Sequence, residues 1–98
     1  MNVTELKQLV AVGELESFSE VARRFYVSTP TVARAMQRIE RCYGVELFVH
    51  GKNKVELNEA GRLAVAGARR ILREIDSSVA EVRAYDRSLR TIDLISCA

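Results

Sequence analysis

Four polar side chains recur along one face of a predicted helix, and three of them are arginines. The stripe is Thr31, Arg34, Arg38 and Arg41, at spacings of three, four and three residues. At about 100° per residue these spacings put all four on the same side of a helix. A guanidinium group offers several N–H donors in a planar fork, which suits phosphate oxygens and the edges of bases. The stripe itself contains no carboxylate, so it favours an anionic partner.

The opposite face of the same helix is apolar. It carries Val32, Met36, Ile39 and Tyr43 at spacings of four, three and four residues. Ser28 is a suitable N-cap, and Pro30 falls in the first turn, where its missing N–H costs nothing. Gly44 is a C-cap candidate that adopts the left-handed conformation without strain. The pattern predicts an amphipathic helix over residues 29–43 with one buried face.

A shorter helix precedes this one. Ser17 and Glu20 have the spacing of a capping box, which predicts a start near Phe18. The apolar side is formed by Val21, Ala22 and Phe25, and the pattern stops at residues 26–27, so the helix has about two turns. Two short helices in succession, the second with a polar face, are typical of a helix-turn-helix, here over residues 17–43.

Two further elements flank the helix-turn-helix. A capping pair, Asn2 with Glu5, and the apolar residues Leu6, Leu9, Val10 and Val12 predict a helix from about Val3 to Glu14, packed behind it. After Gly44, two β-prone runs, residues 45–49 and 55–57, surround residues 50–54. These runs predict a small hairpin, a wing, with a basic tip.

The longest predicted element is a helix from Glu59 to about Arg87, capped by Asn58 and about 43 Å long. Its apolar stripe alternates spacings of four and three residues, and the predicted dimerisation residues are Ala64, Ala68, Ile71, Leu72, Ile75, Val79 and Val82. Such heptads on a helix too long for this domain to cover favour a partner helix. The alternative is a helix folded back on its own domain. Past Arg87, residues 92–96 alternate like a strand.

Composition excludes several other classes of protein. The 98 residues make one small domain, and the formal charge of +2 is concentrated in residues 18–57, with seven basic and four acidic groups. The two cysteines, Cys42 and Cys97, have no metal or redox spacing and are predicted to be reduced thiols. No apolar run reaches transmembrane length and no signal peptide precedes the domain, which predicts a soluble, cytoplasmic protein.

No catalytic chemistry is indicated. The chain has one histidine, no cysteine or histidine cluster, no glycine-rich phosphate loop and no carboxylate pair whose spacing predicts a pocket. We therefore predict no enzyme activity, no metal and no cofactor. His50 is interpreted as a surface residue of the wing and not as a ligand.

The order of elements and the residues within them resemble the N-terminal DNA-binding region of LysR-type transcriptional regulators. The matching positions are Ser17-Phe18 with Ala22, Val27-Ser28 with Pro30, Gly44-Val45 before Leu47-Phe48, and Glu59-Ala60-Gly61. The resemblance covers nearly the whole chain. It implies a mainly α fold: a winged helix-turn-helix over residues 1–58, a dimerisation helix over 59–88, and a hinge over 89–98 that leads into an effector domain absent here.

The resemblance also implies a function and a site. Expected DNA-contacting residues are Ser28, Thr29, Pro30, Thr31, Arg34 and Arg38 on the second helix, and His50, Lys52, Asn53 and Lys54 on the wing. The helix would enter the major groove and the wing would reach the backbone or the minor groove. Expected partners are double-stranded DNA with an imperfect palindrome and a second copy of the chain, with higher oligomers open. The protein would be nucleoid-associated in a bacterium and would bind an effector only with a C-terminal domain.

This chain departs from the family pattern at several positions. Family members usually have glutamine, serine and glutamine where this chain has Thr29, Ala33 and Ala35. The base sequence read by typical members therefore cannot be transferred. His50 replaces a frequent arginine, which predicts a weaker, mildly pH-dependent wing contact. Glu16 replaces a glycine, which predicts a different turn there.

Two other functions compete with DNA binding. A winged helix that binds a protein would use the same elements, but its arginine stripe should be neutralised or covered by apolar side chains. A helical scaffold protein would leave Pro30, the capped turn and the basic wing tip without a purpose. Neither alternative predicts a steep salt dependence of binding to duplex DNA.

Overall fold

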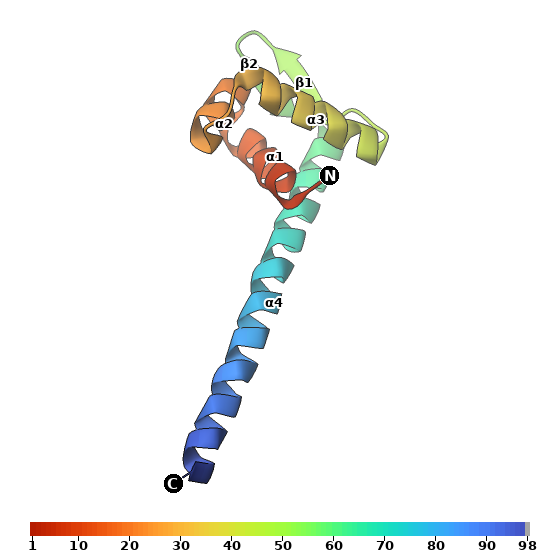
Figure 1. The fold of residues 1–98 in the computed structure, drawn as a ribbon. Helices are drawn as coiled ribbons and strands as arrows, with labels where there is room; N and C mark the ends of the chain where they lie inside the picture. Colours follow the sequence, from red (N-terminus) through yellow and green to blue (C-terminus); the bar gives the residue numbers. More distant parts are fainter. Residues whose placement is uncertain (98) are drawn as a thin grey trace.

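In the computed structural model of the protein, three short helices and a hairpin gather around one end of a long helix (Figure 1). The structure describes the backbone of residues 1–97 and the side chains of residues 1–90. The elements are α1 (Val3–Leu15), α2 (Phe18–Phe25), α3 (Thr29–Tyr43), β1 (Phe48–Gly51), β2 (Lys54–Leu57) and α4 (Glu59–Cys97). This order confirms the predicted fold class, a winged helix-turn-helix followed by a long helix. We call residues 1–70 the head and the rest of α4 the stalk.

The helices of the head begin at the predicted capping residues. In each case a side-chain oxygen accepts a hydrogen bond from the backbone N–H three residues further on: Asn2 from Glu5 at 2.8 Å, Ser17 from Glu20 at 3.2 Å, Ser28 from Thr31 at 3.3 Å and Asn58 from Gly61 at 2.8 Å. Each bond satisfies a donor that the helix leaves free. The Glu20 carboxylate pairs with Arg23 at 3.2 Å. Among the described residues only the Ser17 half of the predicted capping box is formed, because no hydrogen bond joins the Ser17 N–H to Glu20.

The core lies where α1, α2 and α3 meet the hairpin and the first turns of α4. Its largest fully buried side chains are Leu9, Val12, Val21, Val32, Met36, Ile39 and Leu47. The apolar stripe predicted for α3 is therefore buried, with one exception. Tyr43 is 39% exposed, because it lies in the last turn of α3, beyond the elements that cover the rest of the stripe.

The hairpin differs in detail from the prediction. β1 pairs antiparallel with β2 in the register Phe48 with Leu57, His50 with Val55 and Gly51 with Lys54. Only Lys52 and Asn53 form the turn, so residues 50, 51 and 54 belong to the strands, and residues 45–47 precede the first strand. Asn53 has φ of 61°, and asparagine tolerates this left-handed conformation, which allows so tight a turn.

The start of α4 is fastened to the head by close backbone contacts. The Leu47 carbonyl accepts a hydrogen bond from the Asn58 N–H at 3.0 Å. A Cβ atom added at Gly61 would overlap the same carbonyl oxygen, so this position requires glycine. Ala64, Val65 and Ala68 are buried in the head as well. Ala64 and Ala68 were predicted to be dimerisation residues on an exposed face of α4. This is wrong for an exposed face, because the head of the same chain covers both alanines.

The stalk extends well away from the head (Figure 1). α4 continues to Cys97, past the end predicted near Arg87, so the strand-like alternation of residues 92–96 was misleading. No strand in the described chain lies beside these residues to pair with them, whereas a helix satisfies its own backbone groups. The boundaries 59–88 and 89–98 remain predictions of domain organisation. No helix among the described residues combines the length and apolar character needed to cross a bilayer.

Candidate nucleic-acid interface

The N-terminal turn of α3 lies at the surface of the head. Ser28, Thr29 and Pro30 are exposed, and the Ser28 and Thr31 hydroxyls form a hydrogen bond of 2.7 Å. The first turn contains no acidic residue. Free N–H groups and the positive end of the helix dipole favour anions at such a terminus. These four predicted site residues therefore form one continuous surface.

The arginine stripe of α3 is only partly free. Arg34 is exposed and has no ion pair among residues 1–90, whereas the Arg38 Nε lies 3.5 Å from Oε1 of Glu5. Glu5 comes from α1, and its side chain is 11% exposed. The stripe contains no carboxylate of its own, but α1 supplies one to Arg38. Because Arg38 is itself 48% exposed, its remaining N–H donors still face solvent.

Glu5 contributes to this site through Arg38, a role that was not predicted from the sequence. Its second carboxylate oxygen is buried without a hydrogen-bond partner, as is the amide oxygen of Gln8 one turn further along α1. The sequence does indicate that Glu5 is buried, because Glu5, Leu9 and Val12 follow the spacing of four and three residues that is typical of a buried helix face. The capping interpretation of Glu5 concealed this signal.

The wing carries its aromatic contacts on the side that faces α2. The Phe18 ring meets the rings of Phe48 and His50 edge to face, each with centroids 6.0 Å apart. Phe18, His50 and Met36 also line a small cavity of about 160 Å³ between the wing and α3. His50 is exposed, and no ion pair or metal-binding group holds it in the described chain. Its position fits the interpretation of a wing surface residue.

The two wing lysines have different surroundings. Lys52 lies in the turn and has no carboxylate partner among residues 1–90. The Lys54 Nζ lies 2.7 Å from Glu56 and 3.6 Å from Glu16. The hydrogen bond that Lys54 donates to Glu56 and the charge of Glu16 raise the pKa of Lys54, and the same hydrogen bond lowers the pKa of Glu56. Only one of the two predicted wing cations is therefore free.

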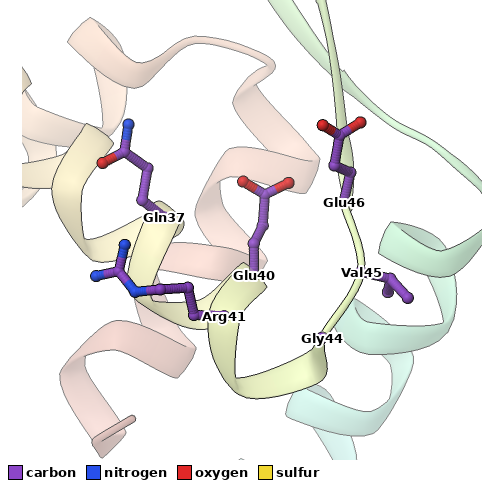
Figure 2. Close-up of a pocket in the computed structure, with 6 residues that line it drawn as sticks. All are labelled: Gln37, Glu40, Arg41, Gly44, Val45 and Glu46. Carbon is purple, nitrogen blue, oxygen red and sulfur yellow. The ribbon is translucent and has the colours of Figure 1, made fainter.

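The C-terminal end of α3 borders a different surface. An open hollow of about 530 Å³ lies here, and Figure 2 shows the residues that line it: Gln37, Glu40, Arg41, Gly44, Val45 and Glu46. Oε2 of Glu40 accepts a hydrogen bond from the Leu47 N–H at 2.7 Å, which fixes the loop before the wing. The two carboxylates make this end of α3 less suitable for phosphate than its N-terminal end.

Cys42 is an exposed free thiol on α3, and the side chain of Cys97 lies outside the described residues. No group of three or more histidine, cysteine, aspartate and glutamate side chains among the described residues is arranged to hold a metal.

A capped helix-turn-helix, a two-stranded wing and a long C-terminal helix define the class of winged helix-turn-helix proteins. Residues 3–62 match the family of bacterial regulatory helix-turn-helix proteins of the lysR type, and the chain belongs to this family.

Known members resemble the chain over most of its length. It is 36% identical to the regulator TfdT of Cupriavidus pinatubonensis over 78 residues, which are 80% of this chain and 34% of TfdT. It is 34% identical to ClcR of Pseudomonas putida over 87 residues, 89% of this chain and 30% of ClcR. The chain thus spans about a third of the length of these relatives.

The fold also matches that of solved family members. The CbnR DNA-binding domain in a complex with DNA superposes with a TM-score of 0.82 at 36% identity, covering 86% of this chain and 97% of that one. Full-length CbnR with its target DNA gives 0.80 at 36% identity, with 86% and 29% covered.

Proposed function

We propose that this chain binds double-stranded DNA sequence-specifically as the DNA-binding region of a dimeric bacterial transcriptional regulator. The observation that carries the proposal is the exposed N-terminal half of α3, where hydroxyl and guanidinium groups stand on one face without an acidic residue in the first turn. A helix presented in this way fits the major groove, whose base edges offer distinct patterns of donors and acceptors.

Within α3 we assign two kinds of contact. Thr29, Thr31 and Arg34 lie toward base edges, and a bidentate arginine is worth about 1–3 kcal/mol of discrimination between bases. The backbone N–H groups after Ser28 and the exposed N–H donors of Arg38 lie toward phosphate. Ala35 is 2% exposed and contributes to the core, so we assign it no contact with DNA. Support comes from the likeness to the CbnR domain in its DNA complex and to the BenM domain in a complex with catB site 1 DNA, which is 28% identical.

Dimerisation is assigned to the stalk. Its apolar side chains are exposed, with Ile71 at 44%, Ile75 at 38%, Val79 at 46% and Val82 at 66%. Burying each is worth about 1.5–3 kcal/mol, and a two-fold interface counts every position twice. We expect a dimer at micromolar concentration, with the two helices antiparallel as in the family. Two heads on one spacer then address an imperfect palindrome with half-sites separated by whole helical turns.

The remaining assignments concern the regulator as a whole. The chain has no recognised catalytic group, and we assign it no enzymatic activity. We assign it to the bacterial cytoplasm, where its DNA lies. A small-molecule effector would act only through a C-terminal domain of a longer chain. A protein-binding winged helix is not favoured, because Arg34 and the hydroxyls around it remain uncovered, although Glu5 partly neutralises Arg38.

Selection from random duplexes, followed by fluorescence anisotropy over a salt series, tests the proposal. We expect one enriched motif with dyad symmetry and an affinity that falls linearly on a plot of log K against log salt. A pool without enrichment, or an affinity independent of salt, would contradict it.

A further inference from the structure

Glu16, at the turn between α1 and α2, has a backbone conformation that suits glycine better than glutamate. It caps α1 with φ of 54° and ψ of 31°, in the left-handed region that L side chains rarely adopt. Its carbonyl accepts a hydrogen bond from the Val55 N–H at 3.0 Å, which ties β2 to the turn. Glycine would make this bond without strain. The glutamate side chain is therefore the part of Glu16 that needs an explanation.

That side chain meets a lysine on the wing. The Lys54 Nζ lies between Oε2 of Glu16 at 3.6 Å and Oε1 of Glu56 at 2.7 Å. Lys54 and Glu56 are two residues apart on β2, so their side chains leave the same face of the strand. The two carboxylates raise the pKa of Lys54, and the lysine lowers the pKa of Glu56. One lysine and two glutamates give this cluster a formal charge of −1.

This arrangement changes the charge that the wing presents. Residues 45–57 contain two lysines, Lys52 and Lys54, and two glutamates, Glu46 and Glu56, so their formal charge is zero. A phosphate that approaches Lys54 competes with two carboxylates and is itself repelled by them. No such competition exists at Lys52, which has no carboxylate partner in the described chain.

We propose that Glu16 and Glu56 withhold Lys54 from the DNA backbone, so that the wing contacts phosphate through Lys52 alone. The inference rests on the proposed function and deepens it. Phosphate contacts strengthen binding to every sequence alike, whereas base contacts discriminate between sequences. Restraining one wing cation therefore lowers the affinity for nonspecific duplex and leaves a larger share of binding to α3.

The experiment uses isosteric changes that remove the charges without altering the exposed surface. Glu16→Gln with Glu56→Gln is measured on nonspecific duplex over a salt series, in the original chain and in a Lys54→Ala background. One freed lysine should steepen the slope of log K against log salt by about 0.9 per protomer, which is about eightfold in affinity at 0.1 M salt. In the Lys54→Ala background the same two changes should have less than half of this effect.

Glu46→Gln is the matched control, since it removes a carboxylate that lies just before β1 and has no ion pair with Lys54. We expect it to change the affinity less than twofold. An equal gain in both backgrounds would overturn the inference, because the carboxylates would then act by repelling DNA directly. No gain in either background would overturn it as well.

Titration of the Glu56 carboxyl by NMR separates this inference from the proposed function. In the original chain its pKa should lie below the usual range for glutamate, and Lys54→Ala should return it to that range. A normal Glu56 pKa in the original chain would overturn the ion-pair arrangement whether or not DNA binds. A chain without salt-dependent DNA binding would instead contradict the proposed function.

Discussion

The head and the stalk differ in the solvent exposure of their periodic apolar side chains. In the head, Leu9, Val21, Val32 and Ile39 are fully buried by elements of the same chain. In the stalk, the apolar residues keep their heptad spacing but remain exposed, from Ile75 at 38% to Val82 at 66%. The same kind of apolar periodicity therefore has two outcomes. Where other elements of the chain pack on the apolar face, the face becomes part of a core. Where no other element packs on it, the face stays exposed and can bind a partner.

The largest effect is expected from breaking the stalk surface at its centre. Ile75→Asp would bury two carboxylates close together in the proposed dimer, at a penalty of several kcal/mol for each ion. Sedimentation should show a monomer, and circular dichroism should show that the head stays helical. The control is Ser77→Asp, at an exposed position on the other side of α4. A dimer that survives Ile75→Asp would place the contact elsewhere.

The next test breaks the junction where the head and α4 meet. Gly61→Ala forces a Cβ atom into the Leu47 carbonyl oxygen and should destabilise the protein by about 1–3 kcal/mol. Gly67→Ala, further along the same helix, has only the side chain of Arg70 nearby at 3.6 Å. It should stabilise the helix by about 0.5–1 kcal/mol. Thermal unfolding measures both, and equal effects would contradict the close packing at Gly61.

The comparison of the head with the stalk also shows which features can be predicted from the sequence. The caps at Ser17 and Ser28 and the buried face of α3 follow from local spacing, and the structure bears them out. The limits of the wing do not follow from local spacing, because the two-residue turn depends on Asn53 adopting a left-handed conformation. The burial of Ala64 and Ala68 also escaped prediction, since a heptad pattern does not say which chain covers it.

The charged contacts were harder to predict than the apolar ones. Glu5 pairs with Arg38, which is far away in sequence, and Lys54 pairs with Glu16 from another element. Spacing rules describe neighbours within one helix or strand, so they do not reveal such pairs. The predicted DNA-contacting residues at the start of α3 and at Lys52 are unpaired with carboxylates, whereas Arg38 and Lys54 each have an acidic partner.

A smaller effect should come from the turn between α2 and α3. Tyr26 has φ of 58° and is 95% exposed, so it has a strained backbone and little packing. Tyr26→Gly should raise the free energy of unfolding by about 0.5–1 kcal/mol, because glycine relieves the strain. Tyr26→Ala keeps the strain and serves as the control. A loss of stability with glycine would show that the tyrosine ring is held by the head.

A test on DNA binding distinguishes the two lysines of the wing. Lys52→Ala should flatten the slope of log K against log salt by about 0.9 per protomer on any duplex. Lys54→Ala should change the slope much less, because Lys54 is already paired with the carboxylates of Glu16 and Glu56. Anisotropy titrations on one nonspecific duplex measure both variants. Equal losses would mean that Lys54 reaches the DNA after all.

The most direct measurement of the central claim compares two duplexes at one salt concentration: the selected site and a scrambled sequence of the same composition. The original chain should prefer the selected site by at least about 10³-fold. Arg34→Ala should lose about 1–3 kcal/mol on the selected site and relax the preference at one base pair. Arg41→Ala, near the far end of the same stripe, should change both duplexes alike. Equal binding of the original chain to both duplexes would contradict the claim that α3 reads base sequence.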